Sequence, residues 1–94
     1  MLCIMICEDR PDSLDLRMAT RAAHLAFIDT VRAQVRLAGP MLSDDGEKMV
    51  GSVFIIEADD IEAARAFNAR DPYTLAGLFG KVTIRPFRQV VPAA

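Results

Sequence analysis

The stretch LCIMIC, from Leu2 to Cys7, decides how this chain folds. Every residue in it is apolar, so both faces of a β-strand built from it would be covered by other parts of the protein. A strand with one face in water would alternate apolar and polar residues, and this one does not. We therefore predict a central strand of a sheet that is covered on both sides.

A long helix is predicted to follow this strand. Pro11-Asp12-Ser13 interrupts the apolar run, and Asp12 can cap the start of a helix. From Arg17 to about Leu37 the chain has no glycine or proline, and Gly39-Pro40 then ends the helical region. Its inward residues recur at helical spacing and define a buried row, made of His24, Phe27, Ile28, Val31 and Val35.

The rest of the chain predicts three more strands and one more helix. In chain order these are a short strand at Met41-Leu42, a tight turn at Ser43 to Gly46, a strand from Met49 to Glu57, a helix opened by Asp59-Asp60-Ile61-Glu62 that stops before Pro72, and a strand from Phe79 to Phe87. Pro86 suits an edge position for the last strand, because proline cannot donate to a neighbouring strand.

The order β-α-β-β-α-β indicates an α+β protein with a ferredoxin-like fold. In this fold a four-stranded antiparallel sheet carries both helices on one face. We expect one domain over residues 1–94. The first and third strands also carry apolar side chains on the face that the helices leave open. A second copy of the chain would cover that face, so we expect a homodimer packed sheet against sheet.

Composition restricts the kinds of partner. The 94 residues carry a net charge of -2, with a pI near 5.2, which does not favour binding to nucleic acid. The opening apolar run is too short to span a membrane or to form a signal peptide, so we expect a cytoplasmic protein without a membrane partner. Cys3 and Cys7 would lie roughly 13 Å apart along a strand, too far for a disulfide. One histidine and two cysteines placed in this way predict no metal site. We also expect no cofactor.

His24 is the candidate with the most chemistry, because it lies within the apolar row of the first helix. Asp71 follows Phe67 by four residues and continues the buried row of the second helix, so the two side chains can meet over the sheet. A carboxylate beside one imidazole nitrogen fixes the tautomer and makes the other nitrogen a general base. The alternatives are a core histidine with one hydrogen-bond partner and an aspartate that begins a turn before proline.

Other polar residues are candidates for binding a substrate. Arg17 and Arg21 precede His24 by seven and three residues, where their guanidinium groups can hold a carboxylate or phenolate, although a solvated helix flank explains them too. Ser52 and Tyr73 offer hydroxyl groups, and packing or turns explain them equally well. The dispersed glycines form no phosphate-binding loop, and no serine lies in a nucleophile motif.

These residues together resemble a known family. The matching segments, in chain order, are Arg17-x-x-x-Arg21-x-x-His24-Leu25, Ala38-Gly39-Pro40, Gly51-Ser52, Asp71-Pro72-Tyr73 with Ala76-Gly77, and Arg85-Pro86-Phe87. Their order and spacing are similar to those of the YciI-like (YCII-related) family. That resemblance implies a ferredoxin-like fold, a dimer related to the dimeric α+β barrels, and a His-Asp active site carried here by His24 and Asp71.

Two functional hypotheses follow. The first is a small cofactor-free enzyme of the lyase or isomerase kind, as the resemblance implies for small ring compounds, in which His24 moves a proton and Asp71 orients it. Arg17 or Arg21 would then bind an anionic or cyclic small molecule. The second is a non-catalytic domain that binds a ligand or partner, in which His24 and Asp71 only lock the helices together. Haem handling would require an axial ligand, for which His24 is the sole histidine.

Overall fold

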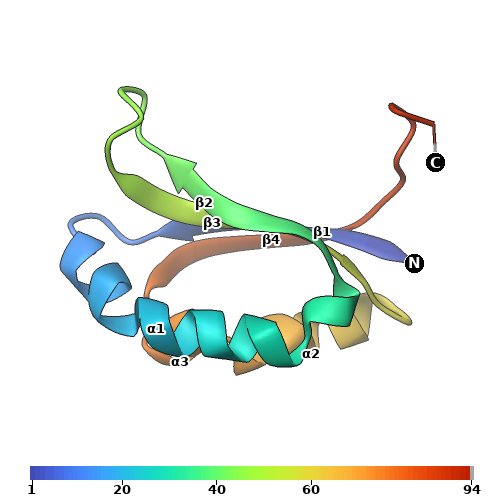
Figure 1. The fold of residues 1–94 in the computed structure, drawn as a ribbon, viewed down its shortest axis with the longest axis horizontal. Helices are drawn as coiled ribbons and strands as arrows, with labels where there is room; N and C mark the ends of the chain where they lie inside the picture. The colour runs from blue at the N-terminus through green and yellow to red at the C-terminus, as the bar shows by residue number, and fades with distance from the viewer. Residues whose placement is uncertain (94) are drawn as a thin grey trace.

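The computed structural model describes residues 1–93 and has the predicted order of strands and main helices, with two short helical turns in addition. These are β1 (Leu2–Asp9), α1 (Leu14–Thr30), a 3-10 turn (Arg32–Gln34), β2 (Val35–Leu42), β3 (Met49–Glu57), α2 (Ile61–Arg70), α3 (Pro72–Leu75) and β4 (Phe79–Phe87). The strands form one antiparallel sheet in the order β2-β3-β1-β4. All the helices lie on one face of it (Figure 1), so the ferredoxin-like fold is confirmed.

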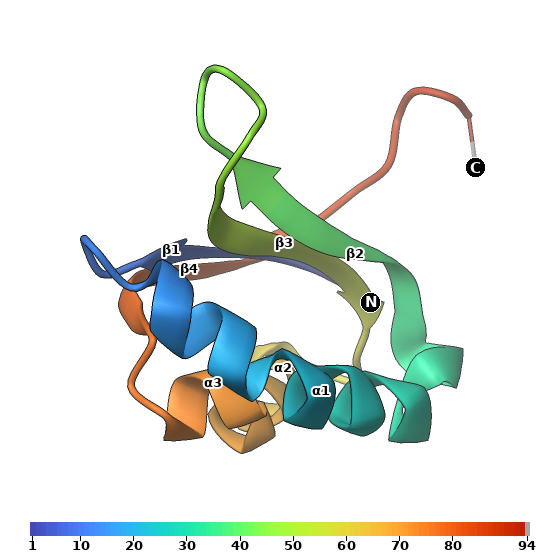
Figure 2. The ribbon, with the colours of Figure 1, turned by 60° about the vertical axis from the view of Figure 1, so that its left-hand side comes forward.

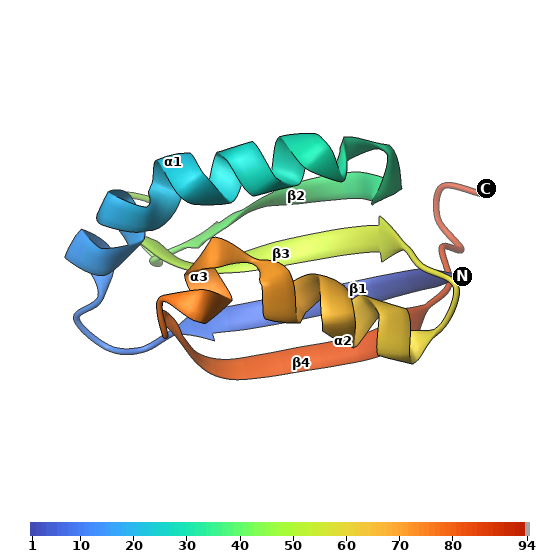
Figure 3. The ribbon, with the colours of Figure 1, turned by 90° about the horizontal axis from the view of Figure 1, so that it is seen from below.

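β1 lies between β3 and β4, as its apolar sequence predicts. Cys3, Met5 and Cys7 point toward the helices and are completely buried. Ile4 and Ile6 point to the opposite face, where they are partly buried. The view from the helix side shows α1 along the β2 side of the sheet and α2 with α3 over its middle (Figure 3).

The predicted extent of the first helix is wrong at its C-terminal end. α1 ends at Thr30, where the Val31 N–H bonds to the Ile28 carbonyl. The predicted strand at Met41-Leu42 is present but starts earlier, at Val35, where a last helical turn was expected. Pairing with β3 decides this, because β2 runs antiparallel along most of that strand. Val35 is therefore a strand residue. Gly39-Pro40 lies inside β2, where proline is tolerated because β2 is an edge strand.

Helix capping agrees with the sequence at α2 and differs at α1. Asp60 caps α2 by accepting a hydrogen bond from the Ala63 N–H at 2.8 Å. α1 begins after Ser13, whose side chain makes no capping bond, and Asp12 has a left-handed φ of 56° and is not the cap. α2 ends at Arg70, as expected before a proline. The short helix α3 was not predicted. Asp71 is both the C-cap of α2 and the N-cap of α3.

The core lies between the sheet and the helices and contains three aromatic rings in edge-to-face contact. The centroid of Phe67 lies 5.4 Å from that of Phe27 and 6.2 Å from that of Phe54. The buried cluster comprises Cys3, Met5, Cys7, Phe54, Ile56, Ala58, Ala64 and Phe67. Because nearly all of these side chains come from β1, β3 and α2, with Ala58 just after β3, the cluster holds α2 against the centre of the sheet.

The second face of the sheet has no cover among residues 1–93. It presents Ile4 and Ile6 from β1 beside their cross-strand neighbours Ile55 and Val53 from β3, with Leu37 of β2 about half exposed. The β2–β3 hairpin and the segment after Phe87 extend away from the helices on this side (Figure 2). Among the described residues, no helix has the length and hydropathy needed to cross a membrane.

Candidate active site

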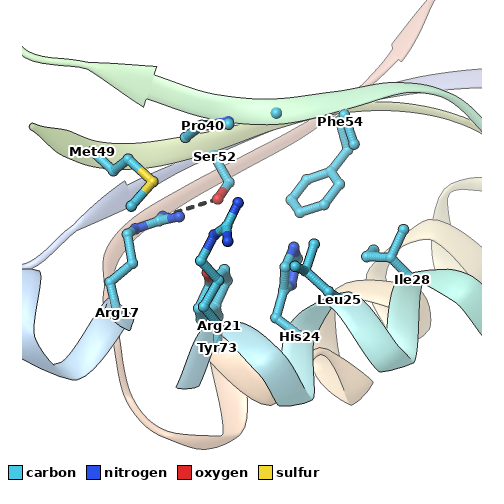
Figure 4. A pocket seen from close by; sticks show the side chains of 12 residues that line it. Arg17, Arg21, His24, Leu25, Ile28, Pro40, Met49, Ser52, Phe54 and Tyr73 are labelled. Atoms are coloured by element: carbon cyan, nitrogen blue, oxygen red, sulfur yellow. Dashed lines mark hydrogen bonds between the residues drawn. The ribbon is translucent and has the colours of Figure 1, made fainter. Parts of the chain in front are cut away.

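A cavity of about 260 Å³ lies between α1 and the β2–β3 side of the sheet. Figure 4 shows arginine and histidine side chains reaching from α1 toward Ser52 and Phe54 on β3. Its lining comprises Arg17, Arg21, His24, Leu25, Ile28, Ala38, Gly39, Pro40, Met49, Ser52, Phe54 and Tyr73. Apolar walls with a few convergent polar groups are typical of a small-molecule site.

His24 and Asp71 meet at the wall of this cavity. The His24 Nδ1 lies 2.8 Å from the Asp71 Oδ1, and the two side chains are 11% and 1% exposed. An ionised carboxylate only accepts hydrogen bonds, so Nδ1 carries the proton and a neutral ring leaves the lone pair on Nε2. Nε2 makes no hydrogen bond within residues 1–93. The structure brings the two residues together, and their catalytic role stays a prediction.

Asp71 is held from two sides because of its place between two helices. The same Oδ1 accepts a hydrogen bond from the Tyr73 N–H at 2.9 Å, which caps α3. The other oxygen, Oδ2, is buried and has no hydrogen-bond partner among the described residues. The carboxylate therefore relies on its single shared oxygen for all of its observed hydrogen bonds.

Tyr73 supports the imidazole of His24 through ring stacking. Their ring centroids lie 4.1 Å apart with an interplanar angle of 16°, and Phe54 meets His24 edge-on at 5.9 Å. The Arg17 guanidinium carbon lies 4.5 Å from the centroid of the Tyr73 ring. Burial raises the pKa of the Tyr73 phenol, and the charges of Arg17 and Arg21 oppose this rise only in part. Tyr73 therefore keeps its proton at neutral pH and remains a hydrogen-bond donor.

Arg17 and Arg21 line the cavity in different states. Arg17 is 2% exposed and is bonded to both oxygens of Asp9 and to Ser52. Burial alone would lower the pKa of Arg17, but the hydrogen bonds and charge of Asp9 outweigh it and raise the pKa. Arg21 is exposed and forms no ion pair within the part of the chain that the structure describes. Arg21 is therefore the cavity cation with a charge still to be balanced.

Sequence reasoning missed several residues of this region. Asp9, Met49 and Phe54 were not among the candidates, and neither were Leu25, Ile28 and the β2 residues Ala38 to Pro40 that line the cavity. The apolar members follow from the fold, because Phe54 lies two residues beyond Ser52 on the same face of β3. For Asp9, the sequence offered a single indication of a role in the site, a charged residue at the end of a predicted central strand.

The two cysteines lie in the core and do not line the cavity. Cys3 and Cys7 are free thiols without exposed surface, and the Cys7 sulfur accepts a hydrogen bond from the Asn68 amide at 3.5 Å. Burial, with the negative charge of Asp71, raises the pKa of the Cys7 thiol to about 12. Within residues 1–93, no cluster of three or more His, Cys, Asp or Glu side chains could hold a metal ion.

The buried Cys7 predicts a loss of stability at alkaline pH. Below its ordinary pKa of 9.0 the thiol is protonated whether the chain is folded or not, and above it only the folded chain keeps the proton. The free energy of unfolding should therefore fall as the pH rises from 9.0 to about 12, by up to ~4 kcal/mol in total. Urea unfolding at a series of pH values measures this. A Cys7→Ala variant should show a shallower slope, and an unchanged slope would contradict the assignment.

These features define a class of protein. The chain is a small α+β domain with a ferredoxin-like sheet, a cavity beside its first helix, and a buried histidine–carboxylate pair at the cavity wall. The family model of the YCII-related domain matches residues 1–88. The chain belongs to the YCII-related family. It is 37% identical to Protein YciI of Escherichia coli O6:H1 over 97 residues, covering 96% of this chain and 99% of that protein.

Solved structures agree with this assignment. The chain is similar to the 5-chloro-2-hydroxyhydroquinone dehydrochlorinase TftG of Burkholderia phenoliruptrix AC1100, solved in complex with 2,5-dihydroxybenzoquinone. The TM-score is 0.86 and the identity 35%, over 94% of each chain. An antibiotic biosynthesis monooxygenase shares the fold at a TM-score of 0.55 and 15% identity, covering 96% of this chain and 99% of that one. These neighbours place the fold in the dimeric α+β barrel class.

Proposed function

We propose that this chain is a small enzyme of the lyase or isomerase kind, in which His24 transfers a proton on a hydroxylated six-membered ring. The observation that carries the proposal is the 2.8 Å contact between His24 Nδ1 and Asp71 Oδ1 at the wall of the cavity. A ring nitrogen fixed in this way leaves the other one free to act as a base. The proposal requires no cofactor, because side chains perform each step.

The reaction uses the two ring nitrogens differently. Asp71 holds the proton on Nδ1, and Nε2 takes a proton from a ring carbon of the substrate in its keto form. The electron pair of that C–H bond passes into the adjacent ring carbonyl and gives an enolate. When the carbonyl re-forms, the pair makes a new ring double bond, and a leaving group on the neighbouring carbon departs with the pair of its own bond. In an isomerase, the proton returns at another carbon instead. Arg21, the unpaired cavity cation among the described residues, stabilises the oxyanion that develops.

The cavity fits a single ring better than a large conjugate. An apolar cavity of about 150 Å³ is enough for benzene, so about 260 Å³ has room for one ring with a few substituents. TftG, which is 35% identical over most of both chains, is named for its action on 5-chloro-2-hydroxyhydroquinone. This likeness supports a hydroxylated quinol or quinone as the substrate class here.

The proposal is tested with the two compounds that the TftG comparison provides. Purified protein is incubated with 5-chloro-2-hydroxyhydroquinone while chloride release is followed, and separately titrated with 2,5-dihydroxybenzoquinone. We expect saturable binding of the quinone and chloride release above the rate without protein. If the quinone does not bind and no chloride is released, the substrate class is wrong.

One observation favours the second candidate function, a non-catalytic ligand-binding or interaction domain. Asp71 also caps α3, so the His24–Asp71 pair joins α1 to the junction of α2 and α3 and can serve the fold alone. In that case the pair contributes to stability without contributing to turnover. Separate measurements of stability and turnover on His24 variants distinguish the two functions.

We also propose that the protein is a homodimer joined through the open face of the sheet. Replacing Ile55 by arginine should convert the dimer to a monomer, because Ile55 lies beside Ile4 near the middle of that apolar face. Sedimentation velocity at micromolar concentration measures the change. Ala26→Arg on the exposed side of α1 is the matched control and should stay dimeric. A wild-type protein that sediments as a monomer would rule out the proposed interface.

A further inference from the structure

Asp9 holds Arg17 in one fixed orientation. Asp9 is the last residue of β1, and its side chain is only 6% exposed. Its Oδ2 accepts a hydrogen bond from the Arg17 Nε at 2.7 Å, and its Oδ1 accepts one from the Arg17 Nη2 at 2.8 Å. This two-point contact fixes the plane of the guanidinium and balances its charge. Arg17 is therefore better suited to orienting a neighbour than to neutralising a charged substrate.

Ser52 is the neighbour that Arg17 orients. The Arg17 Nη2 donates a hydrogen bond to the Ser52 Oγ at 2.9 Å, and Ser52 is only 3% exposed. Figure 4 shows this bond with Ser52 on β3 at the cavity. An arginine N–H cannot accept a hydrogen bond, so the hydroxyl proton of Ser52 has to point elsewhere. The Ser52 hydroxyl donates no hydrogen bond within residues 1–93, which leaves its proton available to a ligand in the cavity.

We propose that Asp9 is a positioning residue of this site: through Arg17 it makes Ser52 a hydrogen-bond donor toward the cavity, so the site selects ligands with an acceptor oxygen there. A carbonyl or a deprotonated hydroxyl satisfies this requirement. The inference rests on the proposed function and deepens it, because it specifies one half of the substrate.

The other half follows from His24, which lines the same cavity. Its Nε2 is an acceptor in the neutral ring, since Nδ1 holds the proton against Asp71. One cavity therefore offers a fixed donor from β3 and a fixed acceptor from α1. The matching ligand carries a carbonyl or oxyanion together with a proton that it can release. Hydroxyquinones and the keto forms of polyhydroxylated rings have both features, whereas simple hydrocarbons and unsubstituted phenols do not have the carbonyl.

Binding of 2,5-dihydroxybenzoquinone to matched variants tests this inference. Ser52→Ala should raise the dissociation constant by about tenfold, the effect of one lost hydrogen bond to an acceptor oxygen. Asp9→Asn should have a similar effect, because a single amide oxygen cannot accept from both the Nε and the Nη2 of Arg17 as the two carboxylate oxygens do. Asp60→Asn replaces a helix-capping carboxylate that is not part of the cavity lining and should bind as the wild type does.

The double variant separates positioning from a general loss of structure. If Asp9 acts through Ser52, then Asp9→Asn with Ser52→Ala should bind no more weakly than Ser52→Ala alone, whereas independent effects would multiply. Multiplied losses, or single variants that bind as tightly as the wild type, would overturn the inference and leave the proposed function intact. If Asp9→Asn fails to fold, an unchanged dissociation constant in Ser52→Ala is sufficient to overturn it.

A measurement without ligand keeps the two proposals apart. The Nε–H of Arg17 should exchange slowly with water in nitrogen-15 NMR spectra of the wild type, because Asp9 holds it, and should exchange rapidly in Asp9→Asn. If the wild type does not bind the quinone, the proposed substrate class fails, and this signal alone decides whether Asp9 holds Arg17. Rapid exchange in the wild type would overturn the positioning role.

Discussion

Replacing His24 by asparagine should reduce turnover by about 10² to 10⁴-fold while the protein stays folded. The amide nitrogen of asparagine lies close to the position of Nδ1, so it can still donate a hydrogen bond to the Asp71 Oδ1. No atom of asparagine takes the place of Nε2, and the proton acceptor in the cavity is lost. Chloride release from 5-chloro-2-hydroxyhydroquinone measures the first effect, and urea unfolding measures the second.

His24→Gln is the matched comparison for this prediction. The longer amide reaches toward the Nε2 position and gives up the contact with Asp71, so it should cost more stability than His24→Asn and also lack turnover. Turnover that is kept in variants that have lost stability would favour the structural role of the pair. If His24→Asn loses several kcal/mol of stability but keeps its turnover, then His24 only joins the helices.

The arrangement of the sheet was accessible from the sequence because burial leaves a local pattern. LCIMIC is apolar at each position, and β1 lies in the middle of the sheet with Cys3, Met5 and Cys7 on its helix side. Helical spacing also indicates which side chains point toward the sheet. His24 and Asp71 each continue an apolar row on a separate helix, and the structure places them in contact.

The end of α1 was not accessible in this way, because pairing between distant segments determines it. Residues 31–37 contain no helix breaker, and the local sequence permits a longer helix. In the structure, Val35 to Leu42 pair with β3 as a neighbouring strand, so these residues are not helical. Gly39-Pro40 does interrupt regular structure, but it does so within an irregular edge strand and not at the end of a helix.

The ion pair that balances the charge of Arg17 could not be predicted from the sequence for a related reason. A guanidinium on a helix facing a cavity resembles a substrate-binding group, and the sequence alone cannot show that its charge is already balanced. The balancing acid, Asp9, belongs to a strand that lies beside α1 only after folding. Arg21, one turn further along the helix, keeps its charge available, so the binding role assigned to either arginine from the sequence suits Arg21 better.

Replacing Asp71 by alanine should destabilise the protein by about 2–6 kcal/mol, since each buried donor that loses its acceptor costs about 1–3 kcal/mol. The substitution leaves two buried donors without an acceptor, the Nδ1–H of His24 and the N–H of Tyr73, and it removes the cap of α3. Because Tyr73 stacks on His24, losing the start of α3 should also disturb the imidazole. The midpoint of urea unfolding, compared with that of the wild type, measures the loss.

Asp71→Asn separates the capping role from the chemical one. Its side-chain oxygen can still accept from the Tyr73 N–H, so the cap survives, and the variant should lose clearly less stability than Asp71→Ala. Without the negative charge, however, nothing requires the proton of His24 to stay on Nδ1, and an imidazole with its proton on Nε2 cannot act as the base. Turnover should fall by at least about 10²-fold. Wild-type turnover in Asp71→Asn would mean that the carboxylate serves the fold alone, since the amide would then supply everything that the reaction needs from this position.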